Sequence, residues 1–330
     1  MKRGNSCIPG LMLVLSILAA ACRADEIPAA ADASVYGQFV GSTPCDIIVR
    51  QQLGIAADAD SNLIQWQLTL HHDPQTQAPA GYRLRCTYGA TVQGTPGLAG
   101  AKSTVESSGS WKLTRGTKTA PAVVVYELSG SVALVKVGHD LLHVLHPDRS
   151  LMVGNGGWSY TLNRLASAEK PGDRDLALAA PSVSYRISPL ATGPKVLGVF
   201  EGRTPALGIA RQLKLPENRA SIKAKWRVTL YQDPQTLEPT TYKVEGSLYR
   251  EGSREGKWTI DRGGADNERA VVYRLEPTRA GEPPILLLQA DDNVLFFLDT
   301  RGKPLVGHAD FGYTLNRRAT AAEPTTSRGH

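Results

Sequence analysis

The feature that most constrains this chain is an internal repeat, in which short blocks occur twice in the same order and at similar spacing. The matching blocks are Gly-Gln-Phe-Val-Gly-Ser-Thr-Pro (37–44) and Gly-Val-Phe-Glu-Gly-Arg-Thr-Pro (198–205), Leu-His-His-Asp-Pro-Gln-Thr (70–76) and Leu-Tyr-Gln-Asp-Pro-Gln-Thr (230–236), Gly-Ser-Trp (109–111) and Gly-Lys-Trp (256–258), Val-Val-Tyr-Glu-Leu (124–128) and Val-Val-Tyr-Arg-Leu (271–275), and Tyr-Thr-Leu-Asn-Arg (160–164 and 313–317). Repeated order and spacing indicate two copies of one module with one shared fold.

Within each copy the apolar residues alternate with polar ones. Ile64, Trp66 and Leu68 alternate with glutamines, and residues 226–230 follow the same pattern. A period of two is typical of strands with one face on a core, and Asp-Pro turns follow both runs. We therefore predict an all-β protein with six to eight short strands per module, forming two tandem antiparallel β-barrels or half-open sandwiches.

The blocks also divide the chain. We place the first module at residues 34–165 and the second at residues 196–318. Residues 166–195 between them have no clear periodicity, which favours a linker. Residues 319–330 are small and polar, which is typical of a frayed tail.

The N-terminus predicts export. Lys2 and Arg3 precede an apolar run at residues 11–21, which has the length of a signal peptide and is too short to span a bilayer. We assign the signal peptide to residues 1–24. The mature chain is expected in the periplasm, on the outer membrane through a lipid anchor, or secreted.

Four cysteines sharpen this expectation: Cys7, Cys22, Cys45 and Cys86. Cys7 leaves with the signal peptide. An exported chain with two remaining cysteines favours a Cys45–Cys86 disulfide over two separate thiols. Cys22 would then be unpaired, so we expect it to be either acylated, since Ala-Ala-Cys resembles a lipobox, or removed by cleavage after Ala24.

Charge gives no reason to expect nucleic acid as a partner. The formal net charge is +6, but Lys2, Arg3 and Arg23 lie at the extreme N-terminus, and without them it is +3. The remaining lysines and arginines are scattered along the chain. We therefore exclude nucleic-acid binding as the function.

Motifs for catalysis are also missing from the sequence, which has no Gly-x-Ser-x-Gly, no His-Glu-x-x-His and no phosphate-binding glycine loop. We therefore expect no enzyme activity and no cofactor. His139, His143 and His146 are the candidate metal ligands. The repeat argues for a structural role instead, because His143 aligns with Phe296 and His146 with Asp299.

The first and last blocks of each module should close the fold. In a closed barrel the first and last strands pair, since an unpaired edge invites aggregation. Gly41 and Gly202 would allow a bend or bulge where the first strand enters the barrel. The residues expected to meet are Phe39, Tyr160 and Leu162 in the first module and Phe200, Tyr313 and Leu315 in the second.

Gly-x-Phe-x-Gly-x-Thr-Pro-Cys at residues 37–45 resembles the start of the NlpE N-terminal domain family, and the later Trp111 and Tyr126 segments fit the same order. The resemblance implies a lipocalin-like barrel and a role in periplasmic copper homeostasis or envelope-stress sensing. The family's Cys-x-x-Cys is incomplete here, because Ile48 stands where the second cysteine would be. A soft-metal site needs two or three converging ligands, so copper binding is not carried over.

The sequence and the resemblance together favour an exported, non-catalytic envelope protein that senses, adheres or binds, linked by the resemblance to envelope stress or copper homeostasis. Its partner would be another envelope protein. The alternative is a lipocalin-like carrier of a small apolar ligand.

Overall fold

The computed structural model of the chain describes residues 1, 34–91, 97–130, 132–166, 195–218, 221–249, 253–264, 267–277 and 279–318. The predicted signal peptide, Cys22, nearly all of the linker and the tail lie outside the described residues. Contacts divide the chain into residues 1–31 and one compact unit, residues 32–330, that contains every strand the structure describes. Among the described residues, no helix has both the length and the apolar composition needed to cross a membrane.

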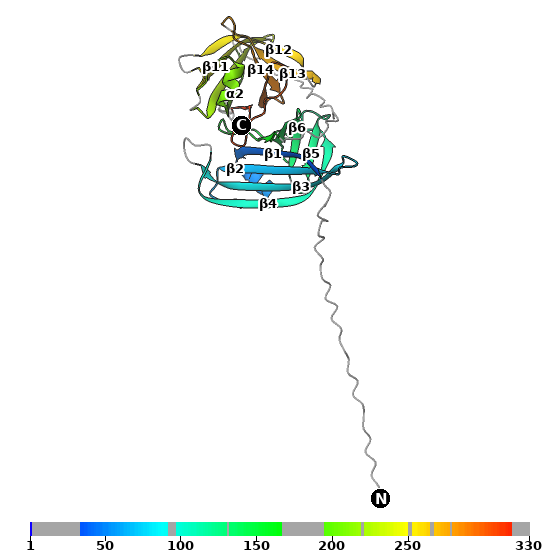
Figure 1. Cartoon of the computed structure of the whole chain (residues 1–330). Helices are drawn as coiled ribbons and strands as arrows, with labels where there is room; N and C mark the ends of the chain where they lie inside the picture. The colour runs from blue at the N-terminus through cyan, green and yellow to red at the C-terminus, as the bar shows by residue number, and fades with distance from the viewer. Residues whose placement is uncertain are drawn as a thin grey trace, which may run out of the picture. The chain divides into compact units, whose positions relative to one another are not determined.

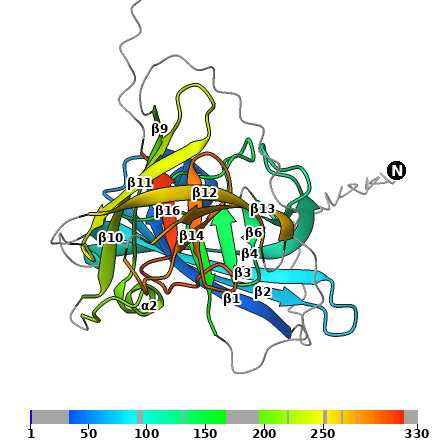
Figure 2. The same cartoon turned by 90° about the horizontal axis from the view of Figure 1, so that it is seen from above.

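Each module is a closed barrel of eight antiparallel strands, which confirms the predicted fold class and excludes the half-open sandwich (Figures 1 and 2). The first barrel comprises β1 (Ser34–Pro44), β2 (Leu63–His72), β3 (Pro79–Thr91), β4 (Leu98–Arg115), β5 (Val124–Leu128), β6 (Ala133–Val137), β7 (Leu141–Val144) and β8 (Thr161–Arg164). The second comprises β9 (Lys195–Pro205), β10 (Lys223–Gln232), β11 (Pro239–Gly246), β12 (Arg254–Gly264), β13 (Asn267–Leu275), β14 (Ile285–Gln289), β15 (Val294–Leu298) and β16 (Thr314–Arg317).

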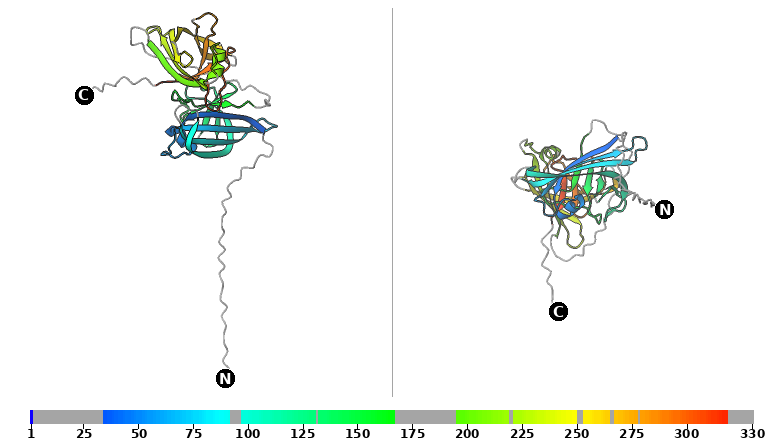
Figure 3. Two further views of the ribbon diagram at one scale, coloured as in Figure 1. Left: turned by 60° about the vertical axis from the view of Figure 1, so that its left-hand side comes forward. Right: turned by 90° about the horizontal axis from the view of Figure 1, so that it is seen from below.

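Figure 3 shows both rings of strands, drawn in blue to green for the first barrel and in yellow-green to orange-red for the second. Within each barrel every strand pairs with the next one, and the barrel closes because its first strand also pairs with its last. Val40 of β1 lies opposite Asn163 of β8, and Glu201 of β9 lies opposite Asn316 of β16. The repeated blocks that open and close each module are therefore neighbours in space.

Gly41 has a different role from the predicted one. The bulge of β1 lies between Val35 and Gly37, not at Gly41. A side chain at Gly41 would instead collide with the carbonyl oxygen of Thr161 (2.6 Å) and with Leu162 (2.8 Å). Glycine is needed here because β8 crosses β1 too closely for a Cβ.

The arginine that ends each Tyr-Thr-Leu-Asn-Arg block packs on the aromatic ring of the opening block. Arg164 Cζ lies 4.8 Å from the centre of the Phe39 ring, and Arg317 Cζ lies 5.0 Å from that of Phe200. Arg164 also donates to the carbonyl oxygen of Tyr36 at 2.9 Å. A cation over an aromatic face is attracted by the ring quadrupole, so this contact helps to hold the closing strand in place.

Two short helices, α1 (Ile47–Leu53) and α2 (Ala206–Gln212), follow the first strand of each barrel. The sequence did not predict them, because seven residues make less than two turns and show no helical periodicity. Asp46 caps α1 by accepting from the backbone N–H groups of Ile48 (3.0 Å) and Val49 (2.9 Å). Val49 and Ile209 are fully buried, so each helix covers part of its barrel's core.

Aromatic side chains shared by the two modules fill the barrels. All twelve are buried: Phe39, Trp66, Tyr82, Trp111, Tyr126 and Tyr160 in the first module and Phe200, Trp226, Tyr242, Trp258, Tyr273 and Tyr313 in the second. The indole nitrogens of their tryptophans are paired in matching ways. Trp66 Nε1 donates to Thr43 Oγ1 at 2.8 Å, and Trp226 Nε1 donates to Thr204 Oγ1 at 2.9 Å. An eight-stranded barrel is just wide enough for side chains to fill.

Equivalent residues of the two modules also contact each other. Asn163 Oδ1 accepts from the backbone N–H of Gly307 at 2.7 Å, and Asn316 Oδ1 accepts from that of Gly154 at 2.7 Å. Thr161 and Thr314 form a hydrogen bond with each other at 2.9 Å. Because these contacts recur with the modules exchanged, this part of the interface has the form of a two-fold symmetric one.

Candidate binding cavity in the first barrel

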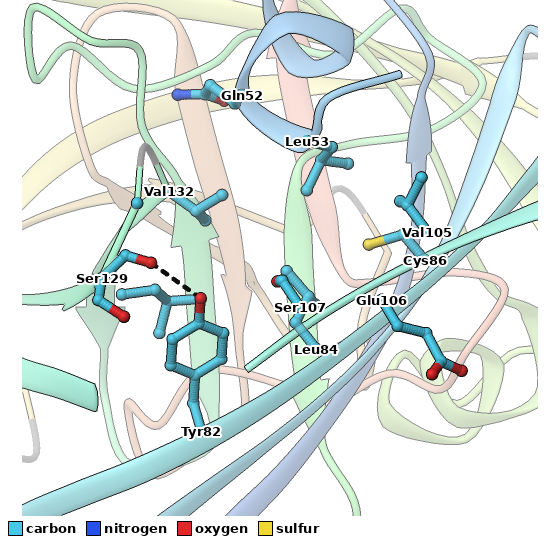
Figure 4. A pocket seen from close by; sticks show the side chains of 12 residues that line it. Gln52, Leu53, Tyr82, Leu84, Cys86, Val105, Glu106, Ser107, Ser129 and Val132 are labelled. Carbon is cyan, nitrogen blue, oxygen red and sulfur yellow. Dashed lines mark hydrogen bonds between the residues drawn. The ribbon is translucent and has the colours of Figure 1, made fainter. Parts of the chain in front are cut away.

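The first barrel contains a cavity of about 130 Å³. Figure 4 shows side chains converging on it from α1, β3, β4 and the β5–β6 connection. Its lining is Gln52, Leu53, Tyr82, Leu84, Cys86, Val105, Glu106, Ser107, Leu128, Ser129, Gly130 and Val132. Ser107 is exposed, so it stands where the cavity opens to solvent.

The lining combines an apolar wall with the polar side chains of Gln52, Tyr82, Glu106, Ser107 and Ser129. Leu84, Leu128 and Val132 are buried around it. The Tyr82 hydroxyl donates to the carbonyl oxygen of Ser129 at 2.9 Å and is therefore already engaged (Figure 4). A mainly apolar cavity with a small number of placed polar groups is the usual character of a small-molecule site.

The second barrel fills the same place with an arginine. Ser107 lies opposite Leu84 on β3, and Arg254 lies opposite Val244 on β11, which are equivalent positions of the two modules. Arg254 is buried, with only 4% of its surface exposed. The first barrel is thus hollow where the second has a buried side chain.

Arg254 is held by a set of contacts that the first barrel lacks. Its Nε donates to the Tyr242 hydroxyl at 2.9 Å and its Nη2 donates to the carbonyl oxygen of Pro283 at 3.0 Å. Its Nη1 lies 3.9 Å from the carboxylate of Glu282. The β13–β14 connection that carries Pro283 and Glu282 is longer than its counterpart at residues 129–132.

Sequence reasoning missed this difference, although a signal for it exists. Trp111 and Trp258 anchor the alignment of the two modules, and Ser107 and Arg254 stand four residues before them. Because side chains four apart on a strand share a face, both residues point the same way as the buried tryptophans. An arginine on the inward face of a predicted strand is rare enough to mark the position.

The predicted disulfide does not form. Cys45 and Cys86 are two free, buried thiols. Burial raises the pKa of the Cys86 thiol, which keeps it protonated and poorly reactive. The expectation for Cys22 assumed that Cys45 and Cys86 pair with each other. Because they remain two buried, unpaired thiols, that reason for expecting Cys22 to be acylated or removed no longer holds. Cys22 itself lies outside the described residues.

Strand geometry explains why the disulfide is absent. Cys86 lies opposite Trp66, which lies opposite Gly41, so Cys86 is two strands away from β1. Two strand spacings are about 10 Å, and the four residues from Gly41 to Cys45 add about 13 Å along the strand. A disulfide requires Cα atoms within about 7 Å.

His143 is a core residue rather than a metal ligand. It is fully buried, with Nδ1 3.0 Å from Thr161 Oγ1 and Nε2 2.8 Å from the carbonyl oxygen of Met152. Because a carbonyl oxygen only accepts, Nε2 carries the proton and Nδ1 accepts from Thr161. Both nitrogens are thus engaged. Its ring also meets Phe296, the equivalent residue of the second module, edge to face at 5.7 Å.

The three candidate histidines do not form one ligand set. His139 lies in the β6–β7 turn, where its carbonyl oxygen accepts from Arg164 Nε at 3.4 Å, and His146 begins the turn after β7. Within the part of the chain that the structure describes, no group of three His, Cys, Asp or Glu side chains could hold a metal ion.

Comparisons of this chain with protein-family models, with curated proteins and with solved structures found no match.

Proposed function

We propose that this protein is a non-catalytic binding protein of the cell envelope, of NlpE-like type, whose first barrel holds a small and mainly apolar ligand. The cavity carries the proposal, because equivalent positions are hollow in one barrel and filled by Arg254 in the other. A signal-peptide-like N-terminus supports the envelope location, and the resemblance supports a sensing or adhesion role.

The volume sets the size of the ligand. An engineered apolar cavity of about 150 Å³ binds benzene, and this cavity is about 130 Å³. A single aromatic ring or a short branched chain fits it, and a long acyl chain does not. Ser107 at the opening offers a hydroxyl to one polar group of the ligand, so phenol is a suitable probe.

Titration of the mature chain with phenol tests the proposal. We expect phenol to raise the unfolding temperature of the native protein, because a ligand that binds only the folded state stabilises it. Ser107→Leu should abolish this rise by filling the cavity. Ser108→Leu is the matched control, since Ser108 is exposed and points to the other face of β4. If both variants lose the phenol-induced rise in unfolding temperature equally, or if the native protein shows no such rise, the site is refuted.

Native mass spectrometry of protein purified from the envelope separates the alternatives for the natural ligand. A retained molecule of about one aromatic ring in size supports the proposal. A retained long-chain lipid or a retained copper ion would contradict it. The first would support a larger-ligand carrier, and the second would support metal binding.

A further inference from the structure

The outer face of the second barrel carries three cations that lie close together. Lys225 of β10 lies directly opposite Arg203 of β9, and Lys223 is two residues along on the same face of β10. Like charges placed directly opposite across two strands are destabilising. Burial, Arg203 and Lys225 lower the pKa of Lys223, which fits this close spacing.

None of these three cations has an acidic partner among the described residues. Arg203 instead faces the ring of Trp158 at 5.5 Å, and Lys223 faces that of Phe311 at 5.9 Å. Aromatic faces attract cations without neutralising them. The positive charge on this face therefore remains available to a ligand.

A hollow of about 330 Å³ lies beside Arg203 and Lys225. Its lining includes a third cation, Arg227, and does not include Lys223. A volume of this order lies within the range of small-ligand sites.

Two carboxylates also line the hollow, and both have cationic partners of their own. Glu201 Oε1 lies 2.8 Å from Arg227 Nε and 3.0 Å from Arg318 Nη1. Glu245 Oε1 lies 3.5 Å from Lys243 Nζ. Glu201 and Glu245 therefore leave Arg203 and Lys225 uncompensated.

The first barrel shows that the fold does not require these charges. Ser42 stands at the position of Arg203, Leu63 at that of Lys223 and Gln65 at that of Lys225. Ser42 and Gln65 face each other in the same register as Arg203 and Lys225. The cationic cluster is thus specific to the second module.

We propose that Arg203, Lys223 and Lys225 form a binding site for a multiply charged oxyanion of phosphate type. An arginine presents paired donors to such an anion, and the two lysines add point charges. Binding would remove the repulsion between opposed cations. The anion could reach the site free in solution or as the headgroup of a phospholipid, and the chemistry of recognition is the same for both.

Calorimetric titration of the mature chain with sodium pyrophosphate at low salt tests the proposal. We expect binding that weakens as salt is added. The double substitution Arg203→Ser and Lys225→Gln, which installs the residues of the first module, should weaken it by at least about tenfold. The matched control is Arg83→Ser with Lys102→Gln, which removes two exposed cations from the first barrel and should leave the affinity unchanged.

Vesicles of phosphatidylcholine with and without phosphatidylglycerol distinguish the two sources. Binding of pyrophosphate that is lost in the Arg203/Lys225 variant supports a free anion. Binding only to anionic vesicles, lost in the same variant, supports a lipid headgroup. Binding to neither probe, or equal losses in this variant and in the control, overturns the proposal. Thermal unfolding provides the folding check, since removing opposed cations should not lower the unfolding temperature.

Discussion

The two barrels share a strand order, six buried aromatic positions and a closing arginine, and they differ where Ser107 of one corresponds to Arg254 of the other. Tyr82 and Tyr242 occupy the same position and donate to equivalent carbonyl oxygens, those of Ser129 and Glu276. One substitution and one longer connection thus separate a hollow barrel from a filled one. The repeated blocks form the strands that both barrels share. The side chains inside each barrel, near Ser107 and Arg254, can differ without changing those strands.

The largest effect is expected where the modules are alike. Leu162 and Leu315 are fully buried on the closing strands of the two barrels. Leu162→Ala and Leu315→Ala should each lower the free energy of unfolding by about 2–5 kcal/mol, as large-to-small core substitutions do. Urea denaturation measures the change. Leu165→Ala, at an exposed position just past β8, is the control and should change stability by less than about 0.5 kcal/mol.

His143 makes the first module sensitive to pH, whereas its equivalent Phe296 cannot titrate. Burial lowers the pKa of His143 to about 4, against the opposing effect of the Met152 carbonyl, and nearby His146 lowers it further. Between pH 6.5 and about 4 the unfolded chain binds a proton that the folded chain does not. Stability should therefore be complete above pH 6.5 and fall by about 3 kcal/mol as the pH approaches 4.

Denaturation of the native protein and of His143→Phe across this pH range measures the effect. The substitution loses two hydrogen bonds, so the slope against pH is compared rather than the absolute stability. An unchanged slope in His143→Phe would show that another group causes the pH dependence.

Exchanging residues between the barrels sharpens the comparison. Arg254→Ser should cost about 1–3 kcal/mol, because it leaves the Tyr242 hydroxyl and the Pro283 carbonyl oxygen without their donor. It should also create a phenol site in the second barrel, detected as a second binding event. Lys257→Ser, on an exposed position of the same strand, should do neither. If Arg254→Ser shows no second phenol-binding event, the longer β13–β14 connection, and not the arginine, excludes the ligand.

The smallest effect is expected at the contact between modules. Asn163 makes two hydrogen bonds there, to Gly307 and to the carbonyl oxygen of His308 at 3.1 Å, whereas Asn316 accepts one from Gly154. Each lost bond costs about 0.5–1.5 kcal/mol, so Asn163→Ala should destabilise more than Asn316→Ala. Thermal unfolding ranks the two variants. A reversed order would contradict the importance of the second bond.

Sequence reasoning succeeded where local pattern decides the outcome. Alternation around Trp66 and the matched blocks predict two antiparallel β modules, barrels or half-open sandwiches, and the repeat assigns His143 to the core position of Phe296. Sequence reasoning failed for the Cys45–Cys86 disulfide, because that prediction depends on the distance between two residues on different strands. The distance is known only once the strand order and the register are known. The cavity was missed for a related reason, since it depends on which side chain of β4 reaches the barrel opening.

The reciprocal contacts of Asn163 and Asn316 have a consequence for how the two halves can change. In a symmetric dimer of separate chains, every substitution appears on both sides of the interface at once. Joining the halves in one chain keeps each surface at high effective concentration near the other, whatever happens to the interiors. Fusion thus allows the interior of one half to differ from that of the other, as Ser107 and Arg254 show, without separating the two surfaces.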